Sequence, residues 1–295
     1  MDHPDDANLP HNREAAAFVA SLARSLHDSK LEIPSCPDAA LRLQRALSST
    51  DIDPSVVESA AAADPALALR IMRMANSVML NPMGREVRDL RTAIARIGYN
   101  MVRTASVSFI LHQLVDAGPA PEPRARMLRL WEESLHVAAF ATVMARRHTR
   151  LNPDVALLAG LLHGVGKLYI LTRLAIETGL CGNEIVRERL LRDWHAPTAG
   201  VIVQSWLLSE EIVDAVESSH DVRTVRQGPL TVGDVVTASR LLAEAHLGEE
   251  QQACATVVAE HEALFRRLGI DAEAAAQVSS EAHEQLASLF AAISG

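Results

Sequence analysis

The chain has few aromatic residues. Phe, Trp and Tyr make up 3% of its 295 residues, although hydrophobic residues as a whole reach 48%. A core of this composition must be built mainly from Leu, Val, Ile, Ala and Met, and small aliphatic side chains suit closely packed helices. The length is sufficient for one large or two modest domains. We find no run of alternating polar and apolar residues that requires a sheet, so the sequence predicts an all-α fold.

Cysteine is also scarce. The three cysteines, Cys36, Cys181 and Cys254, are far apart and form no C-x-x-C pair. This spacing supports neither a disulfide framework nor a zinc site, and it predicts a reducing compartment, the cytoplasm. The acidic, polar start of the chain, from Met1 to Asp6, argues against a signal peptide.

An excess of basic residues and long apolar runs are lacking as well. The formal net charge is -9, and a phosphate-binding surface normally needs a basic face, so we expect no nucleic-acid partner. The longest apolar runs, around residues 107–115 and 155–162, are shorter than the roughly 18 residues that a membrane span needs. We therefore expect a protein without a membrane span.

Helix signals are frequent. Asp64-Pro65 and Asn152-Pro153 each combine an N-cap residue with proline at the first helical position. Asp89 is expected to open a helix that Gly98 closes. Residues 118–123 contain three prolines and predict a linker. Further helices are expected at about 100–115, 124–148, 182–194, 198–208 and 209–219, the last with Ser209 as N-cap, and in three segments that end near residues 248 and 269 and at the C-terminus.

The stretch 161–167, Leu-Leu-His-Gly-Val-Gly-Lys, carries the most specific chemistry. In metal-dependent phosphohydrolases a His-Asp pair on an apolar helix binds metal, and the metal activates water for attack on phosphorus. Here Gly164 follows His163 and offers no ligand atom. Lys167 suits a phosphate at the mouth of a pocket, although an exposed lysine is the more usual case.

Several further segments are arranged in the order found in one family. Together with 161–167, they resemble an HDOD domain over roughly residues 31–245. The segments are Leu-Glu-Ile-Pro at 31–34 with Ala-Leu-Arg-Leu at 40–43, Asp-Pro-Ala-Leu at 64–67 leading to Met-Ala-Asn-Ser at 74–77, Ala-Ile-Ala-Arg-Ile-Gly at 93–98, Trp131 with Ser134, and Trp206 with Glu-Ile-Val-Asp-Ala at 211–215.

The resemblance implies an HD-like multi-helix bundle of the HDOD type with additional terminal helices. It divides the chain into a polar tail and helical lead-in at 1–30, an HDOD domain at 31–228, and C-terminal helices at 229–295 that complete or flank the bundle. Within the HDOD domain it implies an N-terminal helical subdomain to about residue 118 and an HD-like subdomain from about residue 124.

The resemblance also assigns the positions of the former ligands. The first histidine of the HD superfamily falls at Glu133, the His-Asp pair at His163 and Gly164, and the distal aspartate at Ser239. Three of these four ligand positions have therefore changed. Two later histidines of the wider family are retained at His195 and His220. We refer to Glu133, His163, Gly164, Lys167, His195, His220 and Ser239 as the HD-site residues.

These substitutions predict a chain that has kept the scaffold and lost the catalysis. We expect no enzymatic activity, no metal and no cofactor, and a regulatory role in bacterial signalling. Such a protein would bind a signalling protein partner or a small nucleotide ligand in the former active site. The alternatives are a divergent metal-dependent phosphohydrolase or phosphodiesterase with a non-standard ligand set, and a second-messenger receptor without turnover.

Overall fold

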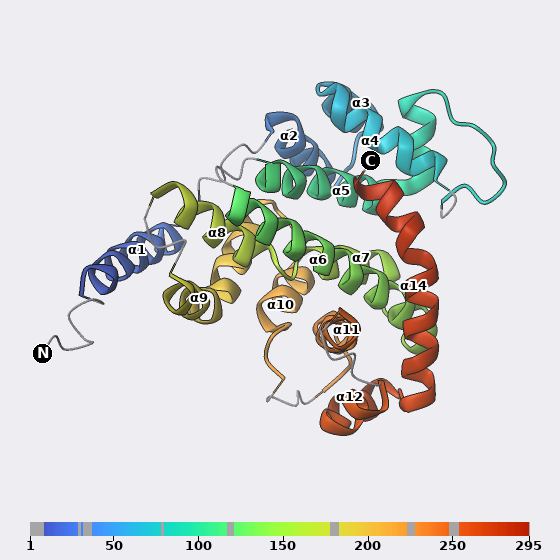
Figure 1. Cartoon of the computed structure of the whole chain (residues 1–295). Coiled ribbons are helices and arrows are strands. Elements are labelled where there is room, and N and C mark those ends of the chain that lie inside the picture. The colour runs from blue at the N-terminus through green and yellow to red at the C-terminus, as the bar shows by residue number, and fades with distance from the viewer. Residues whose placement is uncertain are drawn as a thin grey trace, which may run out of the picture.

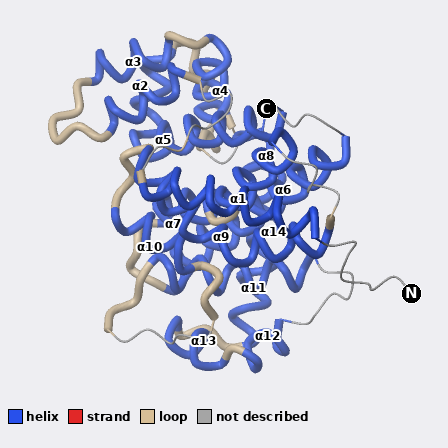
Figure 2. The backbone as a smooth tube through the Cα atoms, turned by 90° about the vertical axis from the view of Figure 1, so that its left-hand side faces the viewer, coloured by secondary structure: helices blue, strands red, loops and turns tan. Residues whose placement is uncertain are grey.

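The computed structural model describes residues 9–28, 31, 37–77, 80–116, 121–177, 183–222, 228–247 and 254–294. All regular structure in these ranges is helical (Figure 2), which confirms the all-α prediction. The fourteen helices of the described ranges are α1 (Leu9–His27), α2 (Asp38–Leu47), α3 (Pro54–Ala62), α4 (Pro65–Asn76), α5 (Leu90–Asp116), α6 (Pro121–His148), α7 (Pro153–Leu162), α8 (Val165–Glu177), α9 (Glu184–Ser205), α10 (Glu210–Ser218), α11 (Val232–Leu247), α12 (Cys254–Glu260), α13 (Glu262–Leu268) and α14 (Ala272–Ser294).

Two groups of helices pack side by side (Figure 1). Helices α2 to α5 contact one another, and helices α6 to α11 form the larger group around α6, α7 and α11. A single cluster of buried side chains runs through both groups, and α5 contacts α6, α7 and α8. The predicted division of the HDOD domain into two subdomains at residues 118–124 stays a prediction, because both groups of helices share one continuous core.

The core is aliphatic, as the composition predicts. Leu, Ile, Val, Ala and Met supply most of the buried side chains, and Trp206, Tyr169 and Phe265 are the largest fully buried ones. The most apolar stretch, Pro153–Ile176, spans α7 and α8 and by length and composition resembles a membrane helix. It is 89% buried inside the protein, which is how the central helix of a globular core behaves.

Both predicted Pro-containing N-caps are confirmed. The Asp64 carboxylate accepts hydrogen bonds from the backbone N–H groups of Ala66 and Leu67. The Asn152 side chain accepts one from the N–H of Asp154. Gly98 interrupts α5 with φ 75° and ψ 165°, a conformation that suits glycine, as the prediction of two helices at this point requires.

Other boundaries differ from the sequence prediction. The linker prediction at 118–123 is wrong in part, because α6 begins at Pro121; residues 118–120 lie outside the described ranges. Proline is tolerated in a first helical turn, where its missing N–H has no helical acceptor. The predicted break between 194 and 198 is also wrong, since α9 continues through Pro197. Its two halves bury their apolar residues in the same core, and this packing outweighs the lost hydrogen bond.

The C-terminal part is more divided than predicted. The segment ending near residue 269 contains two short helices, α12 and α13, and Gly269 closes α13 in the left-handed conformation. Ser209 is the N-cap of α10 but makes no side-chain capping bond. Helix α14 runs along α6 and α11 and reaches α4 and α5 (Figure 1), so the C-terminal helix docks on its own chain.

Candidate functional site

The structure brings most of the HD-site residues together from five elements. Glu133 lies on α6, His163 and Gly164 lie in the turn between α7 and α8, and Lys167 lies on α8. His195 lies on α9, and His220 follows α10. Their side chains are in direct contact. Glu133 contacts His163, and the His220 ring contacts the rings of both His163 and His195.

His163 is held at both ring nitrogens. Nδ1 is 2.8 Å from the carbonyl oxygen of Gly160, and since a carbonyl only accepts, Nδ1 carries a proton. Nε2 is 3.6 Å from Oε1 of Glu133. That contact is attractive when Nε2 is protonated too. The ring is 1% exposed, so the buried imidazole depends on these two partners.

His195 and His220 each retain an unpaired nitrogen. Nδ1 of His195 is 2.7 Å from the carbonyl oxygen of Leu191, which again places its proton on Nδ1. The two rings meet edge to face with centroids 4.3 Å apart, and His220 stacks on His163 at 5.8 Å. Nε2 of His195 and Nε2 of His220 are buried without a hydrogen-bond partner among the described residues. Because Nδ1 of His195 carries the proton, its Nε2 is an acceptor without a donor. Buried polar atoms of this kind call for a protein group, a water or a ligand.

Two cations share this interior. Burial and the neighbouring Arg240 lower the pKa of Lys167, and the carboxylates of Glu133 and Glu244 oppose that shift. Burial alone would raise the pKa of Glu133. The contact with His163 and the nearby cations Lys167 and Arg240 outweigh burial and hold that pKa below its ordinary value.

The pKa values of His195 and His220 are both lowered, whereas a salt bridge would raise the pKa of a histidine. Burial lowers the pKa of His195, and the charge of Lys167 lowers it further. The same two causes lower the pKa of His220 strongly. Both rings are therefore neutral at physiological pH.

Arg240 was missed from the sequence. Its Nε donates to the backbone oxygen of Ser219, directly before His220, and Nη1 pairs with Glu244. An arginine within an otherwise apolar helix such as α11 could have indicated this role, because buried arginines are rare unless they are paired. We call Glu133, His163, Lys167, His195, His220 and Arg240 the buried polar cluster.

The remaining HD-site residues, Gly164 and Ser239, supply no ligand atom to this cluster. Gly164 has no side chain, and the Ser239 hydroxyl is directed to the sulfur of Met144 at 3.9 Å.

An HD-type metal centre does not fit these residues as they lie. Gly164 stands at a ligand position, and the carboxylate of Glu133 is engaged by His163. Over the part of the chain that the structure describes, no three His, Cys, Asp or Glu side chains are placed so that they could hold a metal ion. Two cations in the same interior also oppose a third positive charge.

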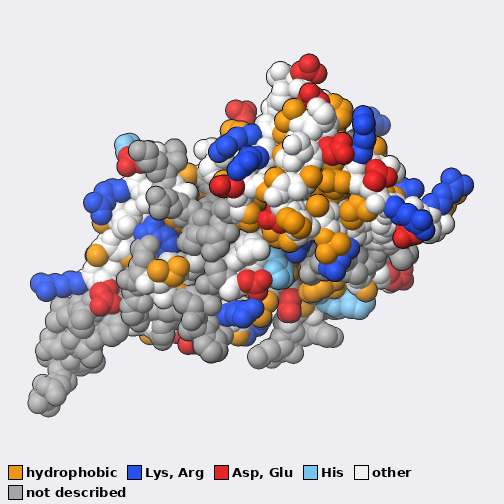
Figure 3. All heavy atoms as spheres, turned by 90° about the horizontal axis from the view of Figure 1, so that it is seen from above, with side chains coloured by type: hydrophobic (Ala, Val, Ile, Leu, Met, Phe, Trp, Pro, Cys, Tyr) orange, Lys and Arg blue, Asp and Glu red, His pale blue; other side chains and the backbone are white. Residues whose placement is uncertain are grey.

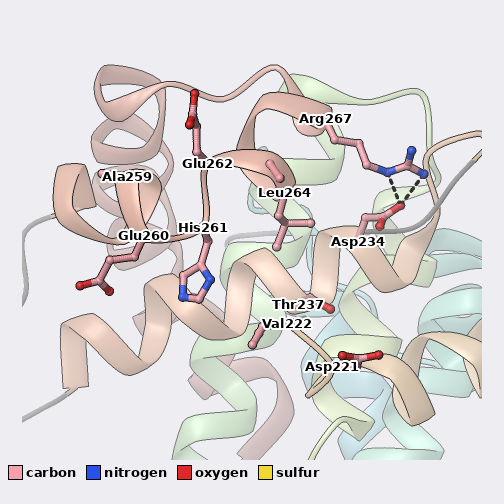
Figure 4. A pocket seen from close by; sticks show the side chains of 11 residues that line it. Asp221, Val222, Asp234, Thr237, Ala259, Glu260, His261, Glu262, Leu264 and Arg267 are labelled. Atoms are coloured by element: carbon pink, nitrogen blue, oxygen red, sulfur yellow. Dashed lines mark hydrogen bonds and ion pairs between the residues drawn. The ribbon is translucent and has the colours of Figure 1, made fainter. Parts of the chain in front are cut away.

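The described surface carries clefts away from the cluster. The cleft in Figure 4 has a volume of about 320 Å³ and lies between α11 and the α12–α13 corner. Arg267 crosses one side of it and pairs with buried Asp234 at 3.1 Å. A second cleft of about 310 Å³ lies between α3 and α5 and is mainly apolar, with Ile94 and Tyr99 in its lining.

Apolar side chains also gather on the face seen in Figure 3, interspersed with charged ones. Val56 of α3 and Leu69 of α4 are each 50% exposed, and Met83 after α4 is 80% exposed.

The described residues form an all-helical, multi-helix bundle. The chain belongs to the HDOD domain family, whose sequence profile matches residues 33–222. The match confirms the resemblance predicted from the segments at 31–245, although it ends before α11.

Known structures and sequences agree with this assignment. An HDOD domain protein of unknown function from Geobacter sulfurreducens is 26% identical, with a TM-score of 0.65 over 92% of this chain and 96% of that one. A provisionally named metal-dependent phosphohydrolase from Shewanella amazonensis SB2B is 22% identical, with a TM-score of 0.67 over 91% and 99% of the two chains. An uncharacterized protein of Treponema pallidum (strain Nichols) is 24% identical over 233 residues, which is 72% of this chain and 42% of that longer protein.

Proposed function

We propose that this protein is a non-catalytic regulator that acts by binding a signalling protein in the cytoplasm. One observation supports the proposal. Of the four positions at which the family resemblance places a metal ligand, three hold Glu133, Gly164 and Ser239, and the side chains present interact with other protein groups. Glu133 faces His163, and Ser239 is directed to Met144. A phosphohydrolase needs a Lewis acid or a metal-bound water at this place, and these residues supply neither.

The exposed apolar side chains favour a protein as the partner. Val56 of α3, Leu69 of α4 and Met83 after α4 are accessible, and an apolar cleft lies between α3 and α5. Exposed apolar surface is typical of protein-binding sites.

A small-ligand receptor is the second candidate, favoured by the unpaired Nε2 atoms. His195 places a buried acceptor, and His220 a second buried nitrogen without a partner, in the interior that also contains the ammonium of Lys167. A nucleotide carries both N–H donors for such acceptors and phosphates for the cation. Binding without turnover would use the former active site as a sensor.

Metal analysis and a turnover assay test the catalytic alternative. The protein is purified from medium supplemented with iron, manganese and zinc, and its metal content is measured beside hydrolysis of a phosphodiester substrate. We expect substoichiometric metal and the same background hydrolysis in the wild type and in His163→Ala. Stoichiometric metal with turnover that is lost in His163→Ala contradicts the proposal.

A thermal-shift series tests the receptor. Cyclic dinucleotides and common nucleotides are each added to the wild type, to His195→Gln and to the surface control His148→Gln. A ligand of the cluster raises the Tm of the wild type and the control but not of His195→Gln, since only a ligand that binds the native state stabilises it. An unchanged Tm in all three proteins rejects the receptor for the compounds tested and leaves the protein-binding regulator.

A further inference from the structure

Three histidines from three different helices meet outside the buried polar cluster. They are His136 on α6, His246 on α11 and His283 on α14. The ring centroids of His246 and His283 are 5.3 Å apart, and those of His136 and His246 are 6.4 Å apart. We call this contact the histidine seam.

The seam lies where the C-terminal helix meets the bundle. Helix α14 packs against α6 and α11 and continues to α4 and α5, so it spans both groups of helices (Figure 1). Ala275, Val278 and Leu289 bury the apolar side of α14. His246 and His283 lie beyond the family match at 33–222, whereas His136 lies within it, so the seam joins the C-terminal part to the family domain.

The charges around the seam do not offset added protons. His246 faces His136 from α6 and His283 from α14, and these two imidazoles are the described charged groups that shift its pKa. Two carboxylates on these helices have partners: Glu244 of α11 pairs with Arg240, and Glu281 of α14 pairs with Arg146 and Arg147 of α6. Glu132 and Glu284 are exposed, and no carboxylate contributes to the pKa shift of His246. His136 uses its Nδ1 proton in a bond to the backbone oxygen of Glu132. Protonating the three rings therefore places like charges side by side.

We propose that the histidine seam is an acid-sensitive lock that holds α14 on α6 and α11 when its imidazoles are neutral and loosens α14 when they are protonated. Two positive rings whose centroids are 5.3 Å apart repel each other, and the partly buried ring of His246 has lost some of the water that a charged imidazole needs. This repulsion acts at His283, in the middle of α14, against the apolar contacts that hold the helix on the bundle. Helix α14 therefore opens locally before the rest of the bundle does.

The direction of the pH dependence follows from linkage. Burial lowers the pKa of His246 below its ordinary 6.5, and the charges of His283 and His136 lower it further. The released or unfolded form therefore binds a proton at higher pH than the docked form. The stability of the docked form is greatest above pH 6.5 and falls as the pH drops through the lowered pKa.

Hydrogen–deuterium exchange of the full chain tests this proposal. Exchange of α14 peptides is compared with that of α7 peptides at pH 7.5 and pH 5.5, after correction for the intrinsic effect of pH on exchange. We expect the α14 opening equilibrium of the wild type to increase severalfold from pH 7.5 to pH 5.5, because the opened form binds protons more readily than the docked form. The α7 peptides should change less.

Two variants make the result specific. The double variant His246→Gln/His283→Gln keeps polar groups of similar size and should lose the pH-dependent opening of α14. If the double variant folds poorly, His283→Gln alone replaces it in the experiment, because position 283 is exposed. Glu281→Gln weakens the ion pairs with Arg146 and Arg147. Burial raises the pKa of Glu281, but these arginines outweigh burial and hold it below 4.5. Glu281 therefore keeps its charge between pH 5.5 and pH 7.5. We expect Glu281→Gln to retain the pH-dependent opening of α14. Equal opening of α14 and α7, or an unchanged pH response in His246→Gln/His283→Gln or in His283→Gln, overturns the proposal. None of these outcomes depends on the proposed partner.

Discussion

A Cβ atom on Gly166 would lie 2.0 Å from the backbone carbonyl oxygen of His195. Helix α8 therefore packs against α9 at a distance that only glycine allows, and this approach brings Lys167 and His195 into the same cluster. Gly166 is thus a packing requirement of the site, whereas Gly164 is the residue that the family resemblance places at a former ligand position.

Gly166→Ala should lower the free energy of unfolding by about 1–3 kcal/mol, because a backbone oxygen cannot move aside as a side chain can. The matched control is Gly164→Ala, whose Cβ would lie 3.1 Å from the rotatable hydroxyl of Ser134. We expect it to cost less than about 1 kcal/mol. Urea denaturation measures both; equal losses in the two variants would refute the close-packing interpretation.

Glu133→Gln should destabilise the protein by about 1–3 kcal/mol, because it removes the anion that faces His163, Lys167 and Arg240. The folded-state pKa of Glu133 is depressed, so its contribution is present above the ordinary pKa of 4.5 and is lost as the pH falls through the folded value. The variant should therefore lose less stability than the wild type on acidification below pH 4.5. Tm against pH measures this, with Glu132→Gln at an exposed neighbouring position as control. Parallel curves for wild type and Glu133→Gln would show that Glu133 is not linked to folding.

Arg267→Met should cost about 3 kcal/mol, because it leaves the carboxylate of Asp234 buried without its cation. Arg267 also donates to the backbone oxygen of Gly228, so it ties α13 to the start of α11. Arg266→Met is the control. It removes an exposed ion pair with Glu262 and should cost less than about 1 kcal/mol. Chemical denaturation measures the free energy of unfolding of both variants. A loss for Arg267→Met no larger than that for Arg266→Met would contradict a stabilising role of the buried Arg267–Asp234 pair.

Asp64→Ala should destabilise α4 by about 1 kcal/mol, since it removes the acceptor for two N–H groups of the first turn. Ser209→Ala changes an N-cap residue that makes no side-chain capping bond. It should stay within about 0.5 kcal/mol of the wild type. The two melting curves test whether the capping bond, rather than the residue type, supplies the stability; an equal drop in Tm would contradict this.

Local signals in the sequence determined much of the fold. The caps at Asp64 and Asn152 and the break at Gly98 act within a few residues, so the chain itself defines them. The aliphatic composition fixed the kind of core, and the order of the family segments identified the HDOD domain. The same order marked Glu133, Gly164 and Ser239 as altered ligand positions, because that comparison needs only the register along the chain.

Tertiary packing decided the rest. Helix α9 runs through Pro197 because residues on both sides of the proline are buried in the same core. The contact of His163 with Glu133 and the unpaired nitrogens of His195 and His220 depend on where five elements meet, which no local pattern records. Arg240 joins them because α11 passes beside Ser219. The histidine seam exists only because α14 folds back on α6 and α11, bringing His283 to residues far from it in sequence.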